Sequence, residues 1–592
     1  MNKILLFICF LYTYTLSAQD SQMALRYFQS GDFEKALVLY EQLLDKNDGN
    51  PQVYQKVLVC YQELQQYAKA QQLIKNRINK YKIAALDVDL GYNFQLQQKN
   101  SEAVQQYEKA LKSIDIQPHL VYQIAKEFED KVLLDYAIKA YELAVLKNDQ
   151  FNFDYQLSLL YGQQGKMEIM VEKLLNYVER NKTNEFGVQN LLVRYLQEDA
   201  DLKFAGILRK ALLNKSQQTQ DVFWNGFLSW FFVQQKEYGK AFIQEKAIFR
   251  RNGDNLRKII SLGRATMTDK DWEQTAEILT FASENTQDKN LILEIQYLKN
   301  EVDIKLATAA NQKAVQAQLN AFLDHYDYSN ATLDLALQTA SFEAFVIKDY
   351  TAAEKKFKQL QQLNLNIYEG AKLKDLMADV FLMQEKFNQS ILLYAQIEDA
   401  LKNHEFAHEA TFKLAKASYY KGDFEWAQKQ FKVLKQATSQ LIANDALELF
   451  LLINDATVAD STQQSLKKFA RADFLIYQNK KAEALTVLKE LLLEHKEEQI
   501  ADATLLRLGE LQQDLGNYQE ALVYFNRIIQ EHKESIYRDE AFFYSAEIYR
   551  LHLQQEDLAK QQYEQIIFHH ADSIHFVEAQ TQYRRLRGDK NL

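Results

Sequence analysis

The sequence predicts an all-α protein built from a long series of similar helix pairs. The 592 residues include only 16 glycines and 2 prolines, whereas hairpins and phosphate-binding loops depend on these residues at their turns. Hydrophobic residues make up 47% of the chain, which is enough for a packed core and too many for a disordered protein. A short pattern of side chains also returns, mostly every 33 to 39 residues, as expected when one structural unit is repeated.

In the recurring pattern, a turn residue and an aromatic residue precede a small residue, and a large residue follows four positions later. Residues 31–33 precede Ala36 and Tyr40, and residues 516–518 precede Ala521 and Phe525. The small position falls at residues 36, 70, 103, 137, 170, 205, 241, 276, 314, 353, 390, 427, 484, 521 and 559. Each interval is long enough for two helices and their turns, so we expect one helix pair per repeat.

A second small residue often lies 12 positions before the first. Gly91 precedes Ala103 in this way, and Gly509 precedes Ala521. Small side chains on both helices of a pair let the two backbones approach closely, while large apolar residues at helical spacing flank the contact. The pattern therefore predicts which residues face each other inside a pair.

These spacings resemble those of the tetratricopeptide repeat family over nearly the whole chain after the N-terminal segment. The resemblance implies a right-handed α-α superhelix of about 12–15 helix-turn-helix repeats, whose first helices line a concave groove. The family's proline at the end of the second helix is missing almost everywhere, since Pro51 and Pro118 are the only prolines. Residues 531–541 and 569–579 are similar to tetratricopeptide repeat proteins of the exported bacterial envelope type, which serve outer-membrane assembly.

The first 18 residues are expected to be a signal peptide. Lys3 precedes an apolar run over residues 4–16, and Ser17 and Ala18 are small, which is the order found in secretory signals. We therefore expect export to the periplasm with cleavage near Ala18. The alternative is a cytoplasmic adaptor in which this segment is a first helix.

The rest of the chain is expected to fall into three parts. Residues 19–284 form an N-terminal array, residues 285–345 an irregular helical junction, and residues 346–592 a C-terminal array with an extra helix and loop near 439–463. The junction and the extra helix are placed where the repeat spacing fails, including the interval of 57 residues between Ala427 and Ala484. No other apolar run is long enough to cross a bilayer, so no transmembrane segment is expected in the mature chain.

One motif has the spacing of a catalytic metal site. Residues 404–408 read HEFAH, and an H-E-x-x-H helix can place His404 and His408 on one face to hold zinc, with Glu405 as general base. However, the motif lies where a first helix is expected to begin, and a solvated helix start is the favoured interpretation. A metal-dependent hydrolase that uses this motif remains the alternative hypothesis.

The favoured function is a non-enzymatic scaffold, without a cofactor, that binds a partner protein or peptide in the groove. The net charge of −10 disfavours nucleic acid as a partner. Repeat register places these residues in the groove: Tyr92, Tyr122, Lys126, Tyr155, Trp230, Phe412, Lys416, Tyr419 and Tyr544. Aromatic side chains of this kind anchor protein interfaces, although packing against a neighbouring repeat would explain each tyrosine equally well. We expect a role in cell-envelope assembly or secretion, with association to an outer-membrane complex.

Overall fold

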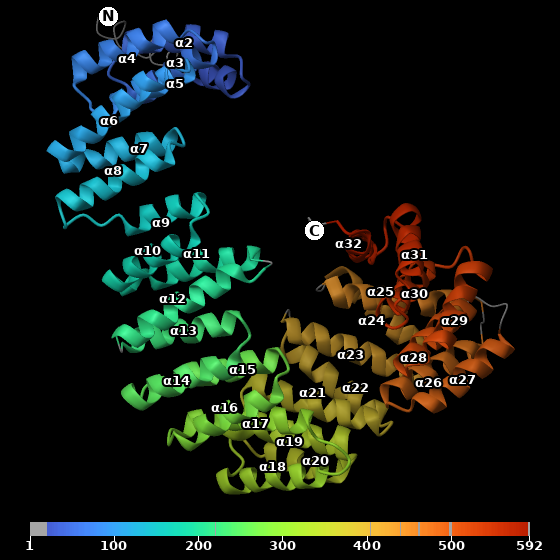
Figure 1. Cartoon of the computed structure of the whole chain (residues 1–592). Helices are drawn as coiled ribbons and strands as arrows, with labels where there is room; N and C mark the ends of the chain where they lie inside the picture. The colour runs from blue at the N-terminus through green and yellow to red at the C-terminus, as the bar shows by residue number, and fades with distance from the viewer. Residues whose placement is uncertain are drawn as a thin grey trace, which may run out of the picture. The chain divides into compact units, whose positions relative to one another are not determined.

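The computed structural model describes residues 21–199, 201–219, 221–402, 404–437, 440–459, 462–495 and 500–589. In these ranges the regular elements are helices, as predicted, and no strand is found (Figure 1). The expected signal peptide at residues 1–18 lies outside the described residues. The chain divides into two compact units, residues 1–262 and 263–592. Their boundary lies inside α15 (Leu256–Thr268), ahead of the junction that was expected at residues 285–345.

The first unit is a series of helix pairs that follow one another in chain order. Residues 21–29 are helical and precede α2. The helices that follow are α2 (Phe33–Lys46), α3 (Pro51–Glu63), α4 (Tyr67–Tyr81), α5 (Leu86–Leu96), α6 (Asn100–Ile116), α7 (Val121–Asp130), α8 (Leu134–Lys147), α9 (Asp154–Gln163), α10 (Met167–Arg180), α11 (Glu185–Glu198), α12 (Lys203–Thr219), α13 (Val222–Gln234) and α14 (Tyr238–Asn252).

The second unit also consists of helices that follow one another in chain order, with a π-helix after α19 and the additional helix α25. Its helices after α15 are α16 (Trp272–Glu284), α17 (Lys289–Lys305), α18 (Gln312–Tyr326), α19 (Leu333–Ser341), a π-helix (Phe342–Ile347), α20 (Tyr350–Leu360), α21 (Ile367–Met383), α22 (Phe387–Ala400), α23 (Glu405–Lys421), α24 (Phe424–Ala437), α25 (Gln440–Ala459), α26 (Gln464–Tyr477), α27 (Lys481–Glu494), α28 (Ile500–Asp514), α29 (Tyr518–Glu531), α30 (Arg538–Leu551), α31 (Glu556–His569) and α32 (Phe576–Arg587). The helix α25 lies within the range 439–463, where the sequence predicts an extra helix.

The two helices of most pairs are joined by short turns with one residue in the left-handed region. Glycine holds this position at Gly31, Gly165, Gly422 and Gly516, but Gln65 and Val132 adopt φ values of 57° and 56° at equivalent positions. Glycine accepts this conformation without steric cost, whereas a β-branched residue does not. The turn geometry is therefore imposed by the packing of the two helices rather than by the local sequence.

The small residues of the pattern lie at close contacts between helices. A Cβ atom on Gly91 would lie 2.5 Å from the Tyr107 ring, and one on Gly509 would lie 2.3 Å from the Phe525 ring. Ala103 and Ala521 are buried on the facing helices. The predicted pairing of small residues is therefore confirmed at both places.

Two of the predicted small positions are wrong by one residue. Thr275 is fully buried where Ala276 was expected, because Asp271 caps α16 and sets its register. Val315 is buried where Ala314 was expected, and Ala314 itself is exposed.

Candidate functional site

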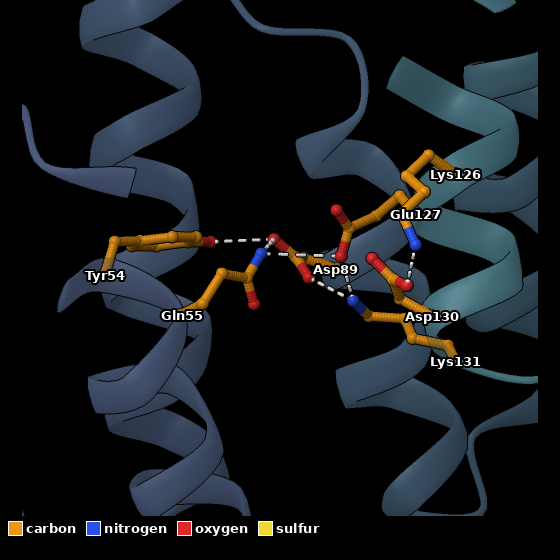
Figure 2. Close-up of polar contacts among 7 residues, drawn as sticks. All are labelled: Tyr54, Gln55, Asp89, Lys126, Glu127, Asp130 and Lys131. Atoms are coloured by element: carbon orange, nitrogen blue, oxygen red, sulfur yellow. Dashed lines mark hydrogen bonds and ion pairs between the residues drawn. The ribbon is translucent and has the colours of Figure 1, made fainter. Parts of the chain in front are cut away.

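A buried ionic cluster joins three first helices in the first unit (Figure 2). The Tyr54 hydroxyl of α3 donates to Asp89 of α5 at 3.1 Å, and the Lys131 ammonium, directly after α7, lies 2.6 Å from the same carboxylate. Lys131 also donates to Glu127 of α7. Asp89 is fully buried, so the cluster ties successive helix pairs together and offers no open site.

Burial and like charge determine how this cluster titrates. Burial, and then the neighbouring Asp89 carboxylate, raise the pKa of Glu127 to about 7. Burial alone would lower the pKa of Lys131, but the two carboxylates outweigh it and raise that pKa. Lys131 therefore stays charged and compensates the two acids.

The predicted groove residues of the first unit do not converge on one pocket. Tyr92 is half-buried, and its ring lies 5.8 Å from the Lys131 ammonium. Tyr122 is 60% exposed and packs edge-on against Phe151 and Phe153. Lys126 is exposed and pairs with Asp130 on its own helix (Figure 2).

The remaining two predicted residues of this unit contact aromatic neighbours. Tyr155 packs on Tyr177 with ring centroids 5.3 Å apart, and half-buried Trp230 packs edge-on against Phe227. A pocket of about 730 Å³ does exist in this unit, but α10 and α12 line it, with polar side chains such as Glu172, Lys210 and Asn214.

In the second unit, three predicted residues come together in one pocket, here named the α25 pocket. Phe412, Lys416 and Tyr419 of α23 all line this space, which has a volume of about 310 Å³. The other lining residues are Tyr420 of α23; Asp445, Glu448 and Leu449 of α25; Asp473, Ile476 and Tyr477 of α26; and Arg507 of α28. Tyr544, also predicted, lies on α30 outside this lining and packs on Phe525 and His575.

Charged groups in the α25 pocket are unevenly paired. The Arg507 guanidinium lies 3.0 Å from Asp473 and 2.7 Å from Glu510, but 3.8 Å from Glu448. Tyr419 is fully buried, and its hydroxyl donates to Asp473 at 3.1 Å. Asp473, helped by the other acids, holds the pKa of Arg507 well above its usual range, so this cation is permanent.

For two other groups of the α25 pocket, burial is the main cause of the pKa shift. It lowers the pKa of Lys416 despite the attraction of Asp473. It also raises the pKa of Glu448, against the effect of Arg507. Both shifts disfavour the charged form, although the Glu448 side chain is still 48% exposed.

A second, larger pocket of the same unit was missed by repeat register; it is named the α19 pocket. Its volume is about 690 Å³, and its lining comes from α17, α19, the π-helix, α21 and α23. Large aromatic side chains reach it: Tyr297 is 40% exposed, Tyr368 is 46% exposed, and Phe345 and Phe406 are half-buried. Tyr297 and Phe345 could not be placed from sequence because the repeat pattern is lost between residues 285 and 345, and Tyr368 and Phe406 were not among the groove positions that repeat register gave.

A π-helix lies at the end of the stretch in which the repeat pattern is lost. Its extra residue per turn rotates Phe345 and Val346 toward the α19 pocket, where both line the wall. Behind them, the buried Glu343 carboxylate accepts from the Lys356 ammonium at 2.8 Å and from Asn320 at 3.0 Å. This ion pair fixes the π-turn from the opposite side, and π-turns are frequent at functional sites.

The H-E-x-x-H motif does not place its two histidines on one helix face, which the zinc hypothesis requires. His404 precedes α23 as its N-terminal cap, with φ −92° and ψ 146°, so it does not share a helix face with His408. Its Nδ1 atom accepts a hydrogen bond from the Phe406 amide at 3.1 Å. Among the described residues, no group of three metal-ligating side chains is found.

Family models identify the repeats at both ends of the chain. Tetratricopeptide repeat models match residues 27–81, and also residues 503–535 and 540–573. The chain is a tetratricopeptide repeat protein. Among curated protein sequences, none matches it.

Two solved structures are similar to this tetratricopeptide repeat protein along most of its length. A chain of the Naa15/Naa10 structure bound to HypK-THB is 12% identical, with 96% of each chain covered and a TM-score of 0.29. A chain of the APC/C hetero-tetramer Cut9-Hcn1 is 12% identical, with 98% of each chain covered and a TM-score of 0.24. In the described part of the chain, no helix has the length and apolar content needed to cross a membrane.

Proposed function

We propose that this tetratricopeptide repeat protein is a non-enzymatic scaffold that binds an extended segment of a partner protein. The observation that carries the proposal is the lining of the α19 and α25 pockets. Helices α17, α19, α21 and α23 line one pocket, and α23, α25, α26 and α28 line the other, so α23 contributes to both. Stacked repeats typically offer such continuous surfaces for binding.

The chemistry of the two pockets favours a polypeptide over a small metabolite. Exposed Tyr297 and Tyr368 supply large contact area with few rotatable bonds, as anchor residues in protein interfaces do. The charged groups, such as the Lys372–Asp334 pair at 2.9 Å, lie along the walls of the α19 pocket. An extended segment can satisfy several such groups in succession.

Substitution on this surface tests the proposal. Tyr368→Ala combined with Phe345→Ala removes two aromatic walls of the α19 pocket. Val523→Ala, at a residue of α29 that is 57% exposed, is the control. Proteins that co-purify with the full chain should be lost from the double variant and retained by the control. Identical sets of co-purifying proteins for all three forms would contradict the proposal, provided that circular dichroism shows each variant folded.

We further propose that the protein acts in the cell envelope, after export by the segment at residues 1–18. Lys3 and the apolar run at residues 4–16 support export, and the acidic chain fits a protein partner. We propose assembly or secretion as the process served, with association to an outer-membrane complex. Sequencing the N-terminus of the mature protein tests export. A chain that begins near Gln19 is expected, and an intact Met1 end would favour the cytoplasmic adaptor.

The hydrolase hypothesis has its own measurement. Purified full-length protein should contain no stoichiometric zinc, and chelation should leave its melting temperature unchanged. One zinc per chain that is absent from the double variant His404→Ala, His408→Ala would support the hydrolase instead.

A further inference from the structure

The α25 pocket owes two of its acids to the helix that interrupts the repeat series. Helix α25 contributes Asp445 and Glu448 to the lining, whereas α23 and α26 contribute most of the aromatic walls. Four carboxylates surround the pocket or its arginine: Asp445, Glu448, Asp473 and Glu510. Two cations, Lys416 and Arg507, face them.

The four carboxylates are not equally compensated. Arg507 is within 3.0 Å of both Asp473 and Glu510, but its distance to Glu448 is 3.8 Å. Within the described ranges, Asp445 makes no ion pair, and neither does Lys416. The Lys416 ammonium instead lies 5.6 Å from the Phe412 ring and 5.9 Å from the Tyr420 ring. The pocket therefore has a negative excess on its α25 side.

The aromatic walls favour one kind of positive group. Phe412, Tyr420 and Tyr477 line the pocket, and aromatic faces attract ammonium and guanidinium groups. The Lys416 ammonium already lies near two of these rings, so the walls are compatible with a neighbouring alkylammonium group. A volume of about 310 Å³ is at the small end of ligand pockets, which suits one long side chain rather than a helix.

An anionic ligand would meet the wrong charge. Burial raises the pKa of Glu448; Arg507 lowers this pKa, and Glu510, Asp473 and Asp445 raise it. A further negative group would add to this repulsion, whereas a cation would relieve it. We propose that the α25 pocket binds a lysine or arginine side chain of the partner segment, with its stem against the aromatic walls and its charge at Asp445 and Glu448. This inference rests on the scaffold function proposed above.

Site-specific crosslinking with the full chain gives the first part of the test. Tyr477, which is 37% exposed in the α25 pocket, is replaced by p-benzoylphenylalanine, as is Tyr368 in the α19 pocket. Val523 on α29 receives the same group as an outer control. After irradiation in cells, mass spectrometry identifies the partner segment attached at each position.

The second part measures the charge contact itself. The segment captured at Tyr477 is synthesised with a fluorescein label, and its affinity for the full chain is measured by anisotropy before and after its basic residue is changed to glutamine. We expect the change to weaken binding to the wild type about tenfold or more. In the double variant Asp445→Asn, Glu448→Gln of the full chain, replacing the basic residue of the segment by glutamine should weaken binding by less than about threefold. Glu425→Gln, at an exposed ion pair of α24, should behave as the wild type.

Each result decides between the two proposals. A Tyr477 segment without lysine or arginine, an acidic or phosphorylated one, or equal losses in wild type and double variant would overturn the inference. Capture at Tyr368 but not at Tyr477 would also overturn it, and would leave the scaffold function standing. No capture at either position, or equal capture at Val523, would contradict both.

Discussion

Gly509→Ala tests the close helix contact on which each repeat depends. A Cβ atom at this position of α28 would lie 2.3 Å from Cε1 and 2.7 Å from Cδ1 and Cζ of Phe525. Carbon atoms normally approach to about 3.5–4.0 Å, so the ring or the helix must move by more than about 1 Å. Phe525 is fully buried, so any movement of its ring must displace neighbouring core side chains.

Two opposing effects set the size of the change. Overpacking of this kind costs about 1–3 kcal/mol, whereas replacing glycine by alanine inside a helix contributes about 1 kcal/mol of stability. Gly226 of α13 separates the two effects, because nothing beyond its own helix backbone lies within 4 Å of the position that a Cβ atom would take. Gly226→Ala should therefore stabilise its helix, and Gly509→Ala should be less favourable than that control by about 1–3 kcal/mol.

Amide hydrogen exchange on the full chain is the suitable assay, since repeat arrays do not unfold as one cooperative unit. Protection in α28 and α29 should fall in Gly509→Ala, and protection in α13 and α14 should rise in Gly226→Ala. Gly91→Ala, with its Cβ 2.5 Å from Tyr107, should repeat the loss in α5 and α6. Equal gains in protection at Gly509 and Gly226 would refute the close packing.

Three further predictions concern the first unit. Val132→Asn should raise the melting temperature and stabilise by about 1 kcal/mol, since Val132 adopts φ 56° in a region that asparagine accepts more readily; an unchanged melting temperature would contradict the strain. Lys131→Met should lower the free energy of local opening of α5 and α7, measured by amide hydrogen exchange, by about 3–5 kcal/mol, because the fully buried Asp89 loses its cation. Adding Asp89→Asn to this variant should restore part of the lost stability. The pKa of Glu127 is raised from 4.5 to about 7, so the folded state binds more protons, and stability should fall as pH rises from about 4.5 to 7, by on the order of 1–3 kcal/mol. Thermal melting against pH should show this fall in the wild type and not in Glu127→Gln.

The helix pairs could be predicted because their packing leaves a direct mark on the sequence. Gly91 and Gly509 are small because a ring of the facing helix occupies the space that a side chain would need. The left-handed turn residues leave no such mark, since Gln65 and Val132 have no intrinsic preference for that conformation. Their φ values follow from joining two packed helices by a short turn.

The candidate site could be predicted only where the repeat is regular. Phe412 and Lys416 were assigned from the repeat register of α23, and both line one pocket; their contact with a partner stays a prediction. Asp445 and Glu448 were missed because α25 has no counterpart in the repeat. Phe345 was missed because it lies in a π-turn, which changes the direction of the side chains relative to an α-helix.

Hydrogen exchange of the full chain, alone and with the protein captured at Tyr477 or Tyr368, tests the scaffold function most directly. Binding along the two pockets should protect amides of α19, α21, α23, α25 and α26, and leave α22, α27 and α29 unchanged. Protection confined to α22, α27 and α29, or no change in any helix at saturating partner, would contradict binding of a protein segment by these pockets.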